Sequence, residues 1–261
     1  MHPVLFRLGP FTVYSFGVAL ALAFLAGTWC AQATMLRAQR LGAPAVLTPS
    51  QTADFVFWLL LSSILGARFL YIVANRDYYL SSPWEVLAVW HGGLIFYGGL
   101  AGGWLAAVWY LRRQQLPMSQ ILDLFTPSLA LGQSIGRIGC FLNGCCYGKP
   151  AGAPWGVRFP WSDVPRYPTQ LFESAATLLF AIVFSGWIFS RRIWERPAHG
   201  RVALTYACVY ALWRFGIECL RGDNPPLALG LNFPQWVSLG LIAVSGVWLS
   251  KSRTSYGVHR T

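Results

Sequence analysis

Long apolar runs separated by short polar connections dominate this chain. A helix needs about 20 mostly apolar residues to cross a bilayer. The runs therefore predict an all-α polytopic membrane protein with about seven transmembrane helices, built as a single transmembrane domain over residues 1–261. No internal repeat or separate soluble domain accompanies them. The predicted spans are 12–36, 52–74, 94–111, 121–142, 170–190, 202–220 and 235–250.

The composition supports this fold class. The chain is 55% hydrophobic and only 11% charged, whereas a soluble chain carries roughly 25% charged residues. Its net charge of +11 comes from short basic clusters between apolar runs. Because these residues do not gather on one soluble face, we expect no nucleic-acid partner.

The basic clusters also predict an orientation. They follow the first, third, fifth and seventh runs, so they fall on one side of a seven-span chain. The positive-inside rule makes that side cytoplasmic, which places the amino terminus outside and the carboxyl terminus inside. The connection over about 143–169 is then a small folded excursion on the outer side.

One stretch, from Gly132 to Gly148, ends an apolar run and carries Arg137 where hydrocarbon is expected. An arginine at membrane depth is costly and usually faces a bundle interior or wet cavity, where it serves a ligand. The alternative is an arginine that only snorkels to the interface. Glycines three and four residues apart in this stretch predict close approach of neighbouring helices.

Further charges lie in other apolar runs. Tyr210, Arg214, Glu218 and Arg221 share one helical face. Arg214 and Glu218 either pair with each other or bind a ligand, and Arg221 is either a surface charge or part of the same group. Arg68 and Glu173 are two more intramembrane charges.

Several arginines near the outer ends of spans suit an anionic phosphate, which guanidinium groups hold with paired hydrogen bonds. The residues alone thus indicate a membrane protein that binds an anionic lipid or phosphate from the outer side. Both an enzyme and a transporter fit this description.

Two other groups have possible chemistry. His91, at the start of a segment with paired glycines, could act as a general base or be a solvated interface residue. Cys140, Cys145 and Cys146 form the one cysteine cluster in the sequence, but their spacing fits no common zinc pattern well. We therefore expect them to be small helix-packing residues, with no metal and no cofactor.

The motif Gly136-Arg137-Ile138-Gly139-Cys140-Phe141-Leu142-Asn143-Gly144-Cys145-Cys146-Tyr147-Gly148 resembles the signature of bacterial prolipoprotein diacylglyceryl transferases. The resemblance covers nearly the whole chain. Its other matches, in order, are Gly66-x-Arg68, the His91–Gly99 segment, Tyr167-Pro168-Thr169-Gln170-Leu171-x-Glu173 and Tyr210-x-x-x-Arg214-x-x-x-Glu218.

This resemblance implies a multi-pass enzyme of the bacterial inner membrane with its active site toward the periplasmic face. Such an enzyme moves the diacylglyceryl group of phosphatidylglycerol onto the lipobox cysteine thiol of a preprolipoprotein signal peptide. The reaction forms a thioether, releases glycerol phosphate and is the first step of lipoprotein maturation. The implied partners are therefore phosphatidylglycerol, preprolipoproteins and membrane lipids.

The resemblance also implies roles for single residues. Arg137 and Arg214 would bind the lipid phosphate and stabilise the departing group, with Arg68 as a further binding residue. Tyr210 would line the site, Glu218 would orient Arg214, Glu173 would brace the pocket, and Asn143 and Gly148 would shape the signature turn.

The chain departs from the family at the proposed base, because Tyr97 stands where well-studied members have a histidine. The base is therefore His91, Tyr97 or no dedicated residue. Two alternative functions stay open: a transporter or flippase for an anionic lipid, which the arginines would also suit, and a paralogue with impaired catalysis, because the histidine is missing.

Overall fold

The structure is a computed structural model that describes residues 2–9, 11–43, 45–88, 92–190 and 200–254. The chain divides into two compact units, Met1–Ala43 with Leu122–Thr261, and Pro44–Ile121. The expectation of a single transmembrane domain stays a prediction. Each unit is described by itself.

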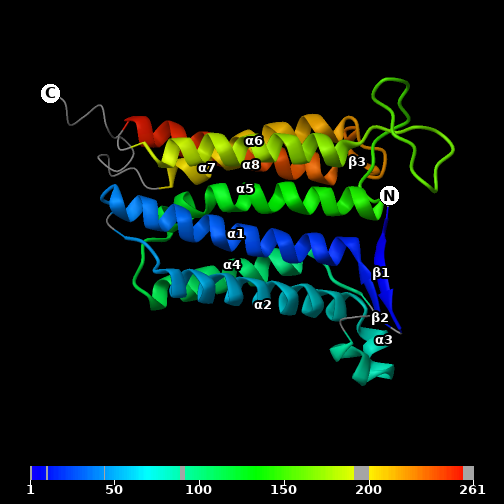
Figure 1. Cartoon of the computed structure of the whole chain (residues 1–261), viewed down its shortest axis with the longest axis horizontal. Coiled ribbons are helices and arrows are strands. Elements are labelled where there is room, and N and C mark those ends of the chain that lie inside the picture. The colour runs from blue at the N-terminus through cyan, green and yellow to red at the C-terminus, as the bar shows by residue number, and fades with distance from the viewer. Residues whose placement is uncertain (1, 10, 44, 89–91, 191–199, 255–261) are drawn as a thin grey trace. The chain divides into compact units, whose positions relative to one another are not determined.

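The first unit contains five long helices that run side by side (Figure 1). They are α1 (Ser15–Arg40), most of α5 (Met118–Asn143), α6 (Thr169–Ile188), α7 (Arg201–Glu218) and α8 (Phe233–Thr254). Two short antiparallel hairpins, absent from the all-α prediction, accompany them: β1 (Val4–Leu8) with β2 (Phe11–Tyr14), and β3 (Pro226–Ala228) with β4 (Leu231–Asn232).

The second unit contains the helix pair α2 (Pro49–Ala74) and α4 (Phe96–Arg113). Between them lie the short helix α3 (Arg76–Ser81) and the 3-10 turn η1 (Pro83–Leu87). A capping box fixes the start of α2, because the Thr48 hydroxyl accepts from the Gln51 N–H at 3.2 Å and the Gln51 side chain accepts from the Thr48 N–H at 3.0 Å.

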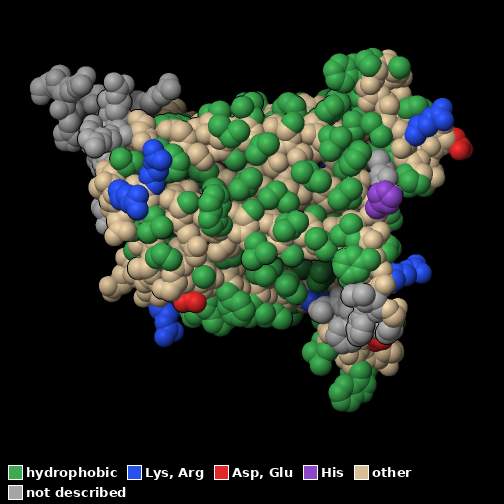
Figure 2. Space-filling model, viewed as in Figure 1, with side chains coloured by type: hydrophobic (Ala, Val, Ile, Leu, Met, Phe, Trp, Pro, Cys, Tyr) green, Lys and Arg blue, Asp and Glu red, His purple; other side chains and the backbone are tan. Residues whose placement is uncertain are grey.

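Each of the seven predicted spans overlaps one long helix. Within the described residues, four helices, α1, α2, α6 and α8, are long and apolar enough to cross a membrane. Large apolar side chains on their flanks are exposed, for example Leu25 at 69% and Ile182 at 63%. On the face shown in Figure 2, hydrophobic side chains cover the helices and Lys and Arg side chains lie toward their ends. The chain is thus a mostly helical membrane protein, and the count of seven spans stays a prediction.

The interior of the first unit contains polar side chains, which is the reverse of a soluble protein. Ser134 on α5 and Ser174 on α6 are both buried, and each hydroxyl donates to the other residue's carbonyl oxygen at 2.9 Å. Small polar residues of this kind join helices in lipid, where apolar surface alone gives no driving force. Asp123 on α5 accepts from the backbone N–H of Gly200 at 2.6 Å and of Ala203 at 2.8 Å, which caps the start of α7.

Glycines decide how closely α2 and α4 pack. A Cβ at Gly98 would overlap the carbonyl oxygen of Gly66, and one at Gly102 would overlap that of Ser62. The two backbones therefore touch where small residues replace larger side chains. For the stretch from Gly132 to Gly148, the predicted close approach of neighbouring helices is only partly correct. A Cβ at Gly139 would lie 2.6 Å from that of Ala19 on α1, but one at Gly136 would meet open space.

Replacing Gly102 with alanine should destabilise the α2–α4 pair, because a backbone carbonyl cannot move aside as a flexible side chain can. We expect a loss of about 1–3 kcal/mol, typical of an overpacked interior. Thermal unfolding in detergent measures it. Gly186→Ala on α6 is the matched control, since a Cβ there meets nothing within 4 Å. Equal melting temperatures for the two variants would contradict this packing account.

Candidate functional site

The charged residues predicted in the first unit meet where the ends of three helices converge. Arg137 lies near the end of α5, Glu173 lies in the first turns of α6, and Arg214 lies near the end of α7. The segment after α7 returns to the α5–α6 connection, where Gly148 pairs with Arg221. Three sequence-distant segments therefore bring their ionisable groups to one place.

Glu173 is the centre of this group. One carboxylate oxygen, Oε1, lies 2.8 Å from Arg137 Nη2 and accepts a hydrogen bond from the Tyr210 hydroxyl at 3.0 Å. The other, Oε2, accepts from Arg214 Nη1 at 2.9 Å. The side chain of Glu173 is 2% exposed. A buried carboxylate needs compensation, and two guanidinium groups with a hydroxyl provide it.

Glu218 is a second buried carboxylate, and it continues the chain of ion pairs. Its Oε1 pairs with Arg214 Nη2 and lies 3.4 Å from Arg221 Nε. Its Oε2 accepts from Asn224 at 2.8 Å and from Asn232 at 2.7 Å. Arg214 is therefore held between two carboxylates, so its pairing with Glu218 is observed, and its binding of a ligand stays a prediction.

Arg221 extends the chain of ion pairs to Asp223. It is buried, with 7% exposure, so it is not a surface charge. Its Nε and Nη2 donate to Asp223 at 2.9 and 2.6 Å. Burial lowers the pKa of Arg221, but the hydrogen bonds and charge of Asp223 outweigh it and raise the pKa overall. The guanidinium therefore stays charged.

Cations and anions alternate along this chain of ion pairs, which we call the ion-pair chain: Arg137, Glu173, Arg214, Glu218, Arg221 and Asp223. Exposure is not shared equally. The side chains of Arg137 and Arg214 are 22% and 14% exposed, whereas those of Glu173 and Glu218 are 2% and 0% exposed. The side chains of the two arginines are therefore more accessible than those of the two glutamates.

The turn after α5 holds its shape through glycines. Gly144 has φ +77° and its N–H donates to the Phe141 carbonyl at 3.1 Å, while the Cys145 N–H donates to the Cys140 carbonyl at 3.2 Å. This pair of bonds is a Schellman motif, which reverses the chain directly after Asn143. At Gly148 a Cβ would lie 2.6 Å from that of Tyr167, so only glycine fits there. The structure thus explains why Gly148 shapes this turn.

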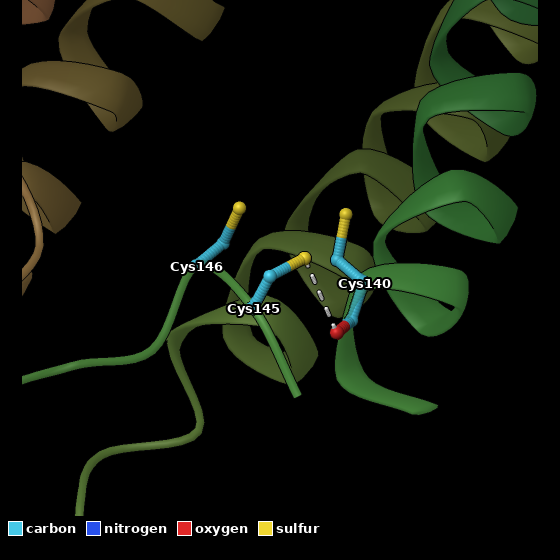
Figure 3. Close-up of side chains that lie close together, drawn as sticks. All are labelled: Cys140, Cys145 and Cys146. Atoms are coloured by element: carbon cyan, nitrogen blue, oxygen red, sulfur yellow. Dashed lines mark hydrogen bonds between the residues drawn. The ribbon is translucent and has the colours of Figure 1, made fainter. Parts of the chain in front are cut away.

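The same reversal brings three thiols together. The sulfur atoms of Cys140, Cys145 and Cys146 all lie within 4.8 Å of one another (Figure 3). Hydrogen bonds from the Cys140 and Cys145 thiols, helped by the charges of Arg221 and Arg137, lower the pKa of Cys146. Sequence spacing did not predict this convergence. The Asn143-Gly144 pair directly after an apolar helix was the signal for a reversal at that point.

In the second unit, Arg68 is buried. All three nitrogen atoms of its guanidinium group donate hydrogen bonds to backbone carbonyl oxygens. The role of Arg68 in binding substrate stays a prediction. The observed contacts show that it holds the described part of the loop between α2 and α4. The acceptors are the carbonyls of Val86 at 3.1 Å, Gly92 at 2.6 Å, Gly93 at 3.3 Å, Ala88 at 3.2 Å, and Glu85.

The two candidate bases also belong to the second unit. Tyr97 lies in the first turn of α4 and is 46% exposed. His91 lies outside the described residues. Their roles therefore stay predictions.

Sequence reasoning named the arginines and glutamates of the ion-pair chain but missed three partners. Asp223, Asn224 and Asn232 hold Arg221 and Glu218. The signal for Asp223 was its position two residues after an arginine. Asn232 gave none, because it lies 14 residues from Glu218 and reaches it only through the β3–β4 turn.

Fold and site together define a helical membrane protein with a buried ion-pair chain that presents two arginines. The chain matches the family model described as prolipoprotein diacylglyceryl transferase over residues 3–250. A phosphatidylglycerol–prolipoprotein diacylglyceryl transferase of Geobacter sulfurreducens is 39% identical, over 92% of this chain and 93% of its own length. The transferase of the same name from Synechococcus elongatus is 35% identical, over 99% and 89% respectively.

A third relative with that name, from Aromatoleum aromaticum, is 35% identical over 97% of this chain and 96% of its own. The chain therefore belongs to the prolipoprotein diacylglyceryl transferase family, and it is a transferase. The alternative functions, a lipid transporter and an impaired paralogue, are not favoured by these relatives.

Replacing Glu173 with glutamine should destabilise the protein strongly, because it leaves Arg137 and Arg214 without their shared anion. Breaking a buried ion pair on one side costs about 3–5 kcal/mol. Thermal unfolding in detergent measures the loss. Asp77→Asn is the control, since Asp77 pairs with Arg76 at 3.5 Å while 91% exposed, and such pairs contribute little. A Glu173→Gln variant as stable as that control would contradict the proposed central role of Glu173.

Proposed function

We propose that this chain transfers the diacylglyceryl group of phosphatidylglycerol to the lipobox cysteine thiol of preprolipoproteins. The products are a thioether-linked lipoprotein precursor and glycerol phosphate. The family of the chain and the names of its relatives support this reaction class. The observation that carries the proposal is the pair Arg137 and Arg214, which share the buried carboxylate of Glu173 and have side chains that are 22% and 14% exposed.

The reaction requires that the lipid phosphate is bound and that the thiol is deprotonated. The thiol loses its proton, and the sulfur attacks the glycerol carbon that bears the phosphate. The carbon–oxygen bond breaks, and the oxygen leaves with the electron pair as glycerol phosphate. Negative charge then grows on the leaving group, where Arg137 and Arg214 stabilise it as cations. No cofactor takes part in this scheme.

The ion-pair chain keeps these arginines in place before the lipid arrives. Glu173 holds both, and Glu218 holds Arg214 from its other side. Donors fixed in this way need no reorganisation as charge develops, which is the main source of electrostatic catalysis. The Tyr210 hydroxyl donates a hydrogen bond to the Glu173 carboxylate, so Tyr210 lines the same site. Asn143 and Gly148 shape the adjoining turn, and Arg68 acts through the loop it holds.

The membrane arrangement belongs to the same proposal. The chain crosses the bacterial inner membrane seven times, with its amino terminus in the periplasm and its carboxyl terminus in the cytoplasm. Basic residues after alternate spans support this orientation. The site then faces the periplasm, where the signal peptides of preprolipoproteins present their lipobox.

The transfer itself is the first test. Purified protein in phosphatidylglycerol vesicles should add a diacylglyceryl mass to a lipobox peptide, measured by mass spectrometry. Arg137→Ala should lower the rate at least about 100-fold, typical of removing one donor to a developing charge. The rate is compared per folded protein, because Arg137 also pairs with Glu173.

Arg76→Ala is the control, since Arg76 is 81% exposed in its ion pair, and its rate should stay near that of the parent chain. Vesicle-bound, folded protein that adds no mass to the peptide would refute the transferase. Movement of labelled lipid between leaflets without conversion would instead support a transporter.

The base is tested by a second pair of variants. His91→Ala should lower the rate more than Tyr97→Phe, because a histidine titrates near neutral pH whereas a tyrosine titrates near 10. The same peptide assay, run from pH 6 to 9 (about the range in which histidine and cysteine titrate), measures both. A larger loss for Tyr97→Phe would assign the base to the tyrosine. Equal, small losses would show that no dedicated base is needed.

A further inference from the structure

The three-cysteine cluster is the feature that the transferase chemistry does not use. Cys140 lies in the last turn of α5, and Cys145 and Cys146 lie in the turn that follows it. Figure 3 shows the three side chains projecting from these segments on the same side of the turn. Their sulfur atoms lie within 4.8 Å of one another, and all three side chains are half-buried.

The backbone holds this convergence in place. Gly144 has φ +77° and Cys146 has φ +63°. The second value is uncommon for a residue with a side chain. Two side chains from the start of α6 fix the turn, because the Gln170 amide donates to the Cys145 carbonyl at 2.6 Å and the Thr169 hydroxyl donates to the Cys146 carbonyl at 2.8 Å. Thr169 and Gln170 are each 1% exposed.

The spacing of the sulfur atoms suits a metal ion. Zinc–thiolate bonds of about 2.3 Å in tetrahedral geometry place sulfur atoms about 3.8 Å apart. Sulfur atoms already within 4.8 Å of one another lie close to that spacing. Among the described residues, no fourth His, Cys, Asp or Glu joins this group, which leaves one position of a tetrahedral ion for an outside ligand.

We propose that Cys140, Cys145 and Cys146 form a binding site for a thiophilic metal cation of the Zn²⁺ class. On binding, the three thiols release their protons and the thiolates coordinate the ion, which gives a complex with one net negative charge. The charges of Arg221 and Arg137 act on Cys146 and offset it. The bound metal clamps the end of α5 to the signature turn. Metal binding here does not require the proposed transferase activity.

Metal binding by the full, untagged chain tests the site without any transferase assay. The reduced protein in detergent is titrated with Zn²⁺ against a chromophoric chelator, and with Cd²⁺ while thiolate-to-cadmium absorbance is recorded. We expect one ion per chain and an absorbance that corresponds to three thiolates. Cys140→Ser should weaken Zn²⁺ binding at least about tenfold, since even residues behind metal ligands contribute that much.

Cys30→Ser and Cys208→Ser are matched controls, because these cysteines lie on α1 and α7 and outside the cluster. They should leave Zn²⁺ binding unchanged. If cluster variants fail to fold, alkylation of the parent chain gives the same answer, since Zn²⁺ should protect the three cluster cysteines but not the exposed Cys219. Absence of Zn²⁺ binding by the reduced chain, equal binding by Cys140→Ser, or protection of Cys219 alone would overturn the proposal.

Discussion

The first unit depends on the carboxylate of Glu173. It is 2% exposed and pairs with arginines from two other helices. Removing such a charge from water is costly, and only close, hydrogen-bonded partners offset the cost. The two guanidinium groups fulfil this condition, which is why α5, α6 and α7 can carry charges where they meet. The side chains of both arginines nevertheless stay partly exposed, at 22% and 14%.

Fold stability and proposed catalysis therefore share one set of contacts. The arginines need Glu173 to remain in the interior, and a lipid phosphate needs the arginines. Glu218, with Asn224 and Asn232, extends this support to the segment before α8. The geometry of the candidate site is thus held by several helices, not by a loop, which suits the proposed reaction, whose leaving group must be met by fixed charges.

The second unit is held together by different contacts from those of the first. Glycines let α2 and α4 touch through their backbones. Arg68 gathers the carbonyls of the loop between those helices, so the irregular backbone there has partners for its oxygen atoms. Tyr97 follows that loop directly at the start of α4. Tyr97, one of the two candidate bases, therefore follows a loop whose described part is held by Arg68.

The sequence by itself determined the membrane class, the positions of the long helices, the family and the arginines and glutamates of the ion-pair chain. These follow from local hydrophobicity and from motif residues that lie close together along the chain. Only the tertiary structure decided the pairings: Glu173 between Arg137 and Arg214, and Asp223 against Arg221. It also decided that the three thiols converge. The physical reason is that pairing depends on distances between segments far apart in sequence, and on backbone reversals such as that at Gly144, which no hydrophobic pattern records.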